Sequence, residues 1–251
     1  MARLRYHAVL TGDIIGSRRL RPAQLDSVRL SLVNAVDLVR RWKRGMVKGR
    51  PEFFRGDGWQ LVLNDPAMAM RVGIFLRASL LAGGLADSRI ATGLGASEAV
   101  RPRRVALSTG PAFVLSGHAL DKMTQYSNMT IEVPKSAGPL SDWMPAIGHL
   151  CDALINQWTR RQAEIVCAAI DPKEPDYERV GQLLKPRVSK QAVAKGLSGA
   201  NWYVIRETIH QFEAMPWEGL LRAAGKHKIQ REDSVNQKGL SGARQPKMVD
   251  R

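Results

Sequence analysis

The amino-acid sequence predicts an α+β domain followed by an all-helical domain. Up to about residue 133, short β-rich apolar runs alternate with segments whose apolar residues recur at helical spacing. Beyond residues 136–139 (SAGP) the spacing is helical throughout. The end of the 251-residue chain is rich in Lys, Arg, Gly, Ser and Gln, which predicts a disordered basic tail. We therefore divide the chain into residues 1–137, 138–216 and 217–251.

The first predicted strand covers residues 6–11 and leads into the sequence GDIIGS. A helix begins at Pro22, because proline is favoured at the first helical position and the apolar residues that follow share one face. That face carries Leu25, Val28, Leu32, Ala35 and Val39. Two strand-like runs, 52–55 and 59–63, are separated only by GDG, which is typical of a tight hairpin.

The rest of the first domain continues this alternation. Asp65 caps a second helix, with Pro66 at its first position. A strand is predicted at 89–95, a third helix at 110–123 and a short strand at 129–133. The order strand, helix, hairpin, helix, strand, helix, strand predicts a mixed sheet with helices on one face.

The second domain begins with an apolar stripe at helical spacing. The stripe consists of Trp143, Ile147, Leu150, Leu154 and Trp158. It is either an interface with a second copy of the chain or the seam between the two domains. Residues 159–162 (TRRQ) are a capping box, so a new helix starts there, and a longer helix follows over 201–212.

Charge and composition narrow the class of function. The chain has 38 Lys and Arg against 23 Asp and Glu, a formal net charge of +15, which favours a polyanionic partner, most often nucleic acid. No apolar run approaches the ~20 residues that span a bilayer, so no membrane partner is expected. Cys151 and Cys167 lack metal-ligand spacing and cannot form a disulfide framework, so we expect core cysteines and a cytoplasmic protein.

Two aspartates stand where the predicted core meets solvent. Asp13 ends an apolar run and Asp57 lies at the tip of the predicted hairpin. If the sheet places them side by side, Mg²⁺ or Mn²⁺ would relieve their repulsion and hold a triphosphate, with Gly16 and Ser17 offering backbone N–H groups to phosphate. The alternative is that Asp57 serves the Asp-Gly turn of the hairpin and that Asp13 caps a turn.

A pair of short helices in the second domain has the spacing of a helix-turn-helix. Residues 177–185 form the first helix, 186–188 the turn, and Ser189 caps a second helix. Val188, Val193 and Leu197 can pack inward, which leaves a polar outer face of Lys190, Gln191, Ala194 and Lys195. Ser189, Lys190, Gln191 and Lys195 are thus candidates for contacts with DNA bases and phosphates. The alternative is a small helical bundle with a solvated basic face.

Several of these segments resemble class III nucleotidyl cyclases and palm-type polymerases. Residues 9–17 (VLTGDIIGS) resemble their first metal motif, and 54–59 (FRGDGW) resemble the second, a Gly-Asp hairpin. Residues 89–93 with Glu98, and 110–120, are similar to the next strand and helix of that fold. The chain to about Phe212 is more specifically similar to the SatD family, bacterial proteins that join a cyclase-like palm domain to a helix-turn-helix.

The resemblance implies a ferredoxin-like, nucleotidyl cyclase-like palm domain followed by an all-α helix-turn-helix domain. It implies that Asp13, the Ile14 carbonyl and Asp57 hold Mg²⁺ or Mn²⁺. A nucleoside triphosphate would lie against Gly16, Ser17, Arg55 and Gly56, and Asp13, Asp57 and Lys122 would be the catalytic groups.

The chain also departs from the cyclase pattern. His118 and Lys122 stand where cyclases carry an Asn and an Arg in the third helix, and Phe53 replaces the purine-selecting Lys. We expect His118 to be a surface residue rather than a catalytic one. These changes alter the contacts to the base and the transition state but keep the aspartate pair.

Three hypotheses for the function follow. The first is a DNA-binding regulator, expected to be a homodimer, whose palm domain binds a nucleotide and Mg²⁺ as a signal. The second is a cyclase or oligonucleotide synthetase that makes a nucleotide signal from nucleoside triphosphates. The third is a non-catalytic dimeric interaction module. The first hypothesis is favoured, because the third-helix residues are altered while the helix-turn-helix pattern is intact.

Overall fold

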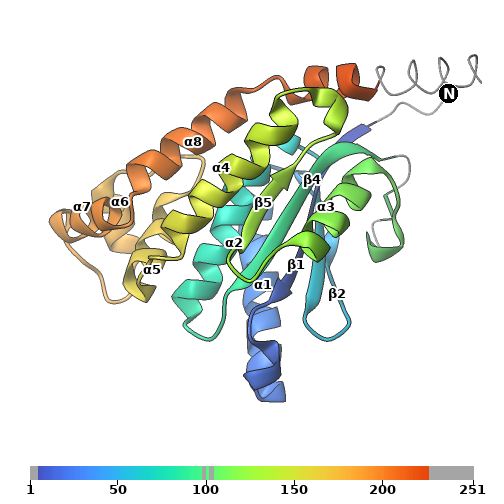
Figure 1. Ribbon diagram of the computed structural model, residues 1–251. Helices are drawn as coiled ribbons and strands as arrows, with labels where there is room; N and C mark the ends of the chain where they lie inside the picture. The colour runs from blue at the N-terminus through green and yellow to red at the C-terminus, as the bar shows by residue number, and fades with distance from the viewer. Residues whose placement is uncertain (1–4, 98–99, 102–104, 226–251) are drawn as a thin grey trace, which may run out of the picture.

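The computed structural model, which describes residues 5–97, 100–101 and 105–225, contains a five-stranded sheet that continues into a helical half (Figure 1). The strands lie in the order β2–β3–β1–β4–β5. Their bounds are β1 Arg5–Ile14, β2 Val47–Phe54, β3 Gly58–Leu63, β4 Ser88–Ser97 and β5 Met129–Glu132. β5 is parallel to β4, and the other neighbouring strands are antiparallel. The α+β fold class is therefore confirmed.

Among the described residues of the first half of the chain, three helices pack on the sheet. They are α1 Pro22–Trp42, α2 Ala69–Gly83 and α3 Pro111–Lys122. The order β1-α1-β2-β3-α2-β4 is the split βαββαβ arrangement of ferredoxin-like folds, and α3 and β5 extend it beyond β4. α1 and α2 share one core with Ala8 and Leu10, whereas Val9 lies in a second core with Phe113 of α3.

The expectation that helices cover only one face of the sheet is wrong, because α3 covers the other face. Ala8, Val9 and Leu10 are all fully buried, and successive side chains of a strand point to opposite faces. Both faces of β1 therefore need a cover. Gly93 of β4 lets α3 approach closely, since a Cβ there would lie 2.3 Å from the Ala112 carbonyl oxygen.

The second half is all-helical, as predicted. Its helices are α4 Leu140–Ile155, α5 Arg160–Ala169, α6 Tyr177–Leu183, α7 Lys190–Gly199 and α8 Trp202–Ala214. α5 packs against α2, and α4 packs against β5. Residues of the sheet and of α8, such as Leu10 and Ile209, belong to one continuous hydrophobic core. That core extends across the predicted boundary at residues 137 and 138.

α2 is the central helix of this core. The window 66–83 is long and apolar enough to cross a membrane, but 67% of it is buried inside the protein, as in the core helix of a globular protein. The window is the one candidate for a membrane span in the part of the chain that the structure describes.

Two buried arginines of α2 bind the helical half. Arg77 is fully buried and donates from Nη1 to Asp152 of α4 at 2.6 Å and from Nε to Asp87 at 3.1 Å. Arg71 donates from Nε and Nη2 to the two carboxylate oxygens of Glu213 in α8, at 2.6 and 2.8 Å. These charges are paired because an unpaired buried charge costs several kcal/mol.

The apolar stripe forms only part of the seam between the two halves, with Ile147 and Leu154 packed against the core. Trp143 and Leu150 are 65% and 68% exposed, whereas Met144, Cys151 and Ile155 of the same helix are buried against the sheet. The seam-forming face of α4 is therefore rotated by about one residue from the predicted stripe. Trp158 alone of the five stripe residues is buried, and its indole N–H donates to the Ala200 carbonyl at 2.8 Å.

The segment assigned to a disordered tail begins too early. Residues 217–225 are helical, and Trp217 and Leu221 are buried. Trp217 packs on Phe212 with ring centroids 4.6 Å apart, and its indole N–H donates to the Phe212 carbonyl at 2.7 Å. These apolar residues are spaced four apart and complete the core. The remainder of the predicted tail, 226–251, lies outside the described residues.

Candidate functional site

The sheet places Asp13 and Asp57 next to each other. In the β1–β3 register Asp13 stands opposite Gly58, the residue that follows Asp57 in the chain. The backbone N–H of Ile14 donates to the Asp57 carbonyl at 3.2 Å. Both aspartates are partly buried at the end of β1. This adjacency could not be derived from the residues themselves, because the two positions are 44 residues apart (57 − 13).

Arg89 of β4 forms an ion pair with the carboxylate of Asp13. It stands directly opposite Asp13 in the β1–β4 register, and its Nε donates to Oδ1 at 2.9 Å while Nη2 donates to Oδ2. The Arg89 and Asp13 side chains are 33% and 22% exposed. The pKa of Arg89 is raised, first by this hydrogen bond and then by the charges of Asp13 and Asp57. One arginine thus neutralises part of the aspartate pair.

Ser17 closes the other side of the pair. Its hydroxyl donates to Oδ2 of Asp57. Gly16 has φ +69°, a left-handed conformation that glycine adopts without strain, and this turns the chain back toward the hairpin. The predicted start of the helix at Pro22 is confirmed, and residues Ser17–Arg19 form a separate 3-10 turn ahead of it. A contact of Gly16 and Ser17 with phosphate stays a prediction.

The hairpin is held against α1 by Arg29. Its guanidinium donates to the Gly56 carbonyl, and it lies 5.9 Å from the centroid of the Phe53 ring. Arg55 and Gly56 both have positive φ, at 51° and 92°, which makes a tight turn. The turn leaves Arg55 exposed beside Asp57.

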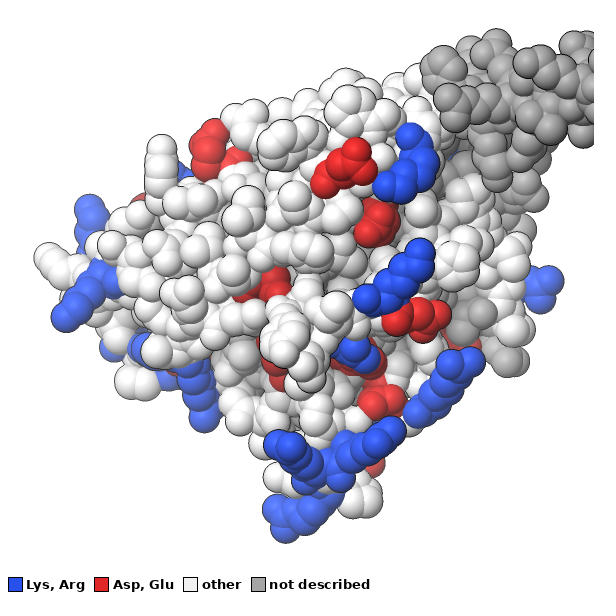
Figure 2. Space-filling model, viewed as in Figure 1, with Lys and Arg blue, Asp and Glu red and all other residues white. Residues whose placement is uncertain are grey.

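The end of the sheet that carries the aspartates is rimmed with positive charge. Arg18, Arg19 and Arg55 are exposed and form no ion pair within the part of the chain that the structure describes. Figure 2 shows Lys and Arg side chains gathered at the lower end of the molecule, where α1 begins. A phosphate-bearing ligand would meet a favourable field there.

Lys122 and His118 are not part of this arrangement. Lys122 ends α3, is exposed, and makes no ion pair with Asp13 or Asp57 among the described residues. Burial raises the pKa of Glu132 on the edge strand β5, and Lys122 is one of the charges that oppose this rise. His118 is exposed on α3. The surface position expected for His118 is confirmed, and the structure gives Lys122 no catalytic partner within the described residues.

As arranged, the predicted metal ligands do not form a metal centre. Both carboxylate oxygens of Asp13 accept from Arg89, and one oxygen of Asp57 accepts from Ser17. The described residues include no group of three or more His, Cys, Asp or Glu side chains that could hold a metal ion. A divalent cation on Asp13 would lie close to the guanidinium of Arg89, and the repulsion between the two positive charges would favour the departure of Arg89.

The helix pair α6–α7 is built as the sequence predicts. The Ser189 hydroxyl accepts from the backbone N–H of Ala192 at 3.2 Å and so caps α7. Val193 and Leu197 are buried, and Gly196 and Gly181 allow close packing against Ile165 and the Val188 carbonyl. The candidate DNA-contacting residues Ser189, Lys190, Gln191 and Lys195 are all exposed.

Lys190 has a second environment besides solvent. It lines a cavity of about 380 Å³ between α6 and α8, together with Glu174, Asp176 and Arg206. The two carboxylates that line this cavity are engaged elsewhere: Glu174 is hydrogen-bonded to His210, and Asp176 caps α6. Gln191 and Lys195 do not line this cavity.

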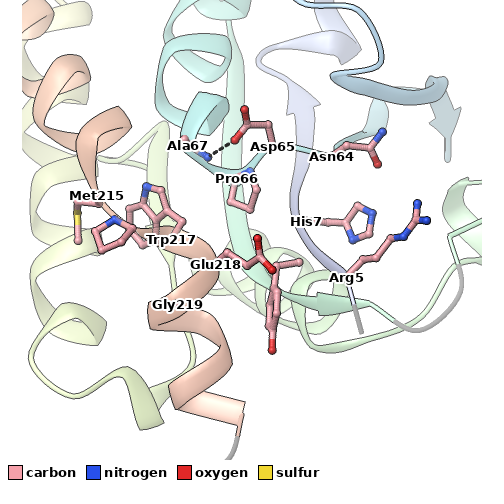
Figure 3. Close-up of a pocket in the computed structure, with 12 residues that line it drawn as sticks. Arg5, His7, Asn64, Asp65, Pro66, Ala67, Met215, Trp217, Glu218 and Gly219 are labelled. Carbon is pink, nitrogen blue, oxygen red and sulfur yellow. Dashed lines mark hydrogen bonds between the residues drawn. The ribbon is translucent and has the colours of Figure 1, made fainter. Parts of the chain in front are cut away.

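A larger pocket lies at the opposite end of β1 from the aspartates (Figure 3). Its volume is about 740 Å³, and it is lined by the start of β1, residues 64–67 and residues 215–219. His7 in this pocket is buried, and its Nδ1 is 2.6 Å from the Ser97 hydroxyl. None of the predicted site residues lines the pocket.

The stability of the protein should fall on acidification because of His7. Burial lowers the pKa of His7 below its ordinary 6.5, so the unfolded chain binds the proton more readily and stability is lost as the pH falls through about 6.5. We expect the melting temperature of the His7→Gln variant to drop less between about pH 7.5 and 5.5 than that of the wild type. His118→Gln, at an exposed position, should keep the wild-type pH dependence; an equal effect of both variants would contradict the assignment.

The chain was compared with known proteins in three ways. No family model matches it, and no curated protein matches it. A crystal structure of the guanylyl cyclase Cya2 superimposes on it with a TM-score of 0.35 and 16% sequence identity, covering 54% of this chain and 77% of that chain.

Proposed function

We propose that this protein is a DNA-binding regulatory protein of SatD type. In this proposal α6 and α7 form a helix-turn-helix, and the sheet domain is a cyclase-like palm that binds a nucleotide with Mg²⁺ or Mn²⁺ as a signal. The observation that carries the proposal is the capped helix α7, which is anchored by Val193 and Leu197 and presents Lys190, Gln191 and Lys195 to solvent. This is how a recognition helix is offered to a major groove.

The surroundings of α7 favour DNA over a plain helical bundle. Lys185 and Arg187, in the turn between α6 and α7, are exposed as well. Together with the net charge of +15, these side chains can neutralise phosphates on either side of a groove. Gln191 can pair with adenine, and Lys190 with guanine or phosphate. Because a single helix-turn-helix reads one half-site, we propose that the protein binds as a homodimer.

A chain of hydrogen bonds connects the aspartate pair with the helical half. The Ser88 hydroxyl donates to the Asp13 carbonyl at 2.6 Å, and the neighbouring Asp87 accepts from Arg77. Arg77 in turn donates to Asp152 and Asn156 of the α4 end. A ligand that shifts Asp13 or β4 would therefore disturb these buried hydrogen bonds, which extend to α4. They offer a physical route by which ligand binding could affect the helical half.

The Lys190→Glu, Gln191→Ala double variant tests the DNA-binding proposal. Fragments from around the protein's own gene would be titrated in a gel-shift assay, and we expect the variant to bind its site about 100-fold more weakly, since each lost base contact costs about 1–3 kcal/mol. Lys135→Glu makes the same charge change at an exposed position outside α6–α7 and should keep nearly full affinity. Wild-type protein without any specific site, or a double variant that binds like wild type, would refute the proposal.

The adjacency of Asp13 and Asp57 supports a second candidate, a metal-dependent enzyme that acts on nucleoside triphosphates. The pair lies at the end of the central strand, and the exposed Arg18, Arg19 and Arg55 are within two residues of Ser17 or Asp57 in the chain. The test is incubation with each triphosphate and Mg²⁺ or Mn²⁺, with products read by mass spectrometry and Asp57→Asn as the control. A cyclic or oligomeric product that the variant fails to make would establish an enzyme; unconsumed triphosphate would rule it out.

A further inference from the structure

Arg89 and Asp13 form a complete two-pronged pair. The fork of the guanidinium meets both oxygens of the carboxylate, from directly opposite positions of two neighbouring strands. Such pairing is the geometry that an arginine adopts with a phosphate as well as with a carboxylate. The partner of Arg89 can therefore be exchanged without rebuilding the strand that carries it.

The surroundings of the pair attract anions more than bare cations. Arg18, Arg19 and Arg55 are exposed, form no ion pair with any described residue, and lie within two residues of Ser17 or Asp57 in the chain. Of the two aspartates of the site, Asp13 is already paired with Arg89, and Asp57 accepts from Ser17. The positive charge of these arginines would repel a divalent cation that arrives alone, whereas it would attract a polyphosphate.

We propose that Arg89 is a resident counter-cation that keeps divalent metal ions off Asp13 until a triphosphate takes over its guanidinium. The proposal rests on the nucleotide-binding part of the proposed function and goes beyond it by setting the order of binding. Arg89 would pair with a phosphate of the triphosphate, and the Asp13 oxygens that it releases would join Asp57 as ligands for the cation. In the absence of a triphosphate, the site therefore has only a low affinity for divalent metal ions.

Calorimetric titration with Mn²⁺ alone, with the triphosphate alone and with the preformed Mn²⁺–triphosphate complex tests this order. We expect Arg89→Gln to bind Mn²⁺ alone at least about ten-fold more tightly than the wild type, since the variant loses a competing ion pair. Arg89→Lys keeps the charge and should bind Mn²⁺ about as weakly as the wild type. Adding Asp57→Asn to Arg89→Gln should abolish the gain, which places the metal at this site.

Wild-type protein should bind the Mn²⁺ complexes of ATP and of inorganic triphosphate, and should bind Mn²⁺ alone only weakly. The titration with inorganic triphosphate separates recognition of the phosphates from recognition of the base. Circular dichroism melting shows that each variant is folded before titration. If Arg89→Gln gains no affinity for Mn²⁺, the counter-cation role is overturned. If Arg89→Gln gains affinity but no triphosphate complex binds the wild type, the release of Asp13 by triphosphate and the nucleotide part of the proposed function are both refuted. The DNA-binding part is tested separately, by the gel-shift assay of the Lys190 and Gln191 variant.

Discussion

Replacing Arg77 with methionine should destabilise the protein by about 3–5 kcal/mol. The side chain of Arg77 is fully buried, and it pairs with Asp87 and Asp152, of which Asp152 is itself 3% exposed. Burial alone would lower the pKa of Arg77, but its hydrogen bonds and the charges of the two aspartates raise it overall, so the guanidinium is held charged. Methionine fills similar space but leaves two carboxylates without their cation. Denaturant unfolding, followed by circular dichroism, measures the loss.

A second variant separates the unpaired charge from the lost packing. Asp152→Asn in the Arg77→Met background removes one stranded charge and keeps an oxygen to accept from the Asn128 backbone N–H, now 2.8 Å from Asp152. We expect this double variant to recover about 1–2 kcal/mol of the loss. A double variant as unstable as the single one, or a single variant that unfolds like wild type, would show that the charge network does not hold α4 to α2.

Gly93→Val should cost about 3 kcal/mol or more, because α3 cannot move away from the sheet without opening a core. A Cβ at Gly93 would lie 2.3 Å from the Ala112 carbonyl oxygen and 2.6 Å from the Ser116 backbone nitrogen. Both are backbone atoms of α3, which no rotation of a side chain can displace. Valine is otherwise favoured in strands, so a loss of stability cannot come from strand propensity.

Gly117 of α3 is the matched control for this substitution. A Cβ at Gly117 meets nothing within 4 Å, and the position is in the middle of the helix. Gly117→Ala should therefore stabilise the protein by about 0.5–1 kcal/mol. Equal loss of stability in both variants, measured by thermal melting, would mean that α3 is sensitive to any change rather than seated on Gly93.

The helix starts and the strand positions could be predicted from local signals. Pro22 begins α1, Thr159 caps α5 by accepting from the Gln162 N–H at 3.2 Å, and Ser189 caps α7. The hairpin around Asp57 has a strand on either side, as predicted, although β2 begins at Val47, well before the predicted run 52–55. These features depend on hydrogen bonds and dihedral angles within a few residues of the chain.

The inner face of α4 could not be predicted as well. Its apolar residues go almost all the way round the helix, with Trp143 and Leu150 outside and Met144, Cys151 and Ile155 inside. When both sides of a helix are apolar, periodicity cannot say which side meets the core. The assignment of residues 217–225 to a disordered tail is wrong for a related reason. Trp217 and Leu221 belong to a basic stretch of the sequence, and it is the core beside Phe212 that buries them.

By itself, the sequence determined that this protein joins an α+β half to a helical half, where helices such as α1, α5 and α7 begin, and which face of α7 meets solvent. Only the tertiary structure decided the state of the aspartate pair. Asp13, Asp57 and Arg89 are far apart in the chain and meet through the register of β3, β1 and β4. Strand register depends on which side chains the whole core can bury, so a charge partner across a sheet is set by packing at a distance and leaves no local pattern to read.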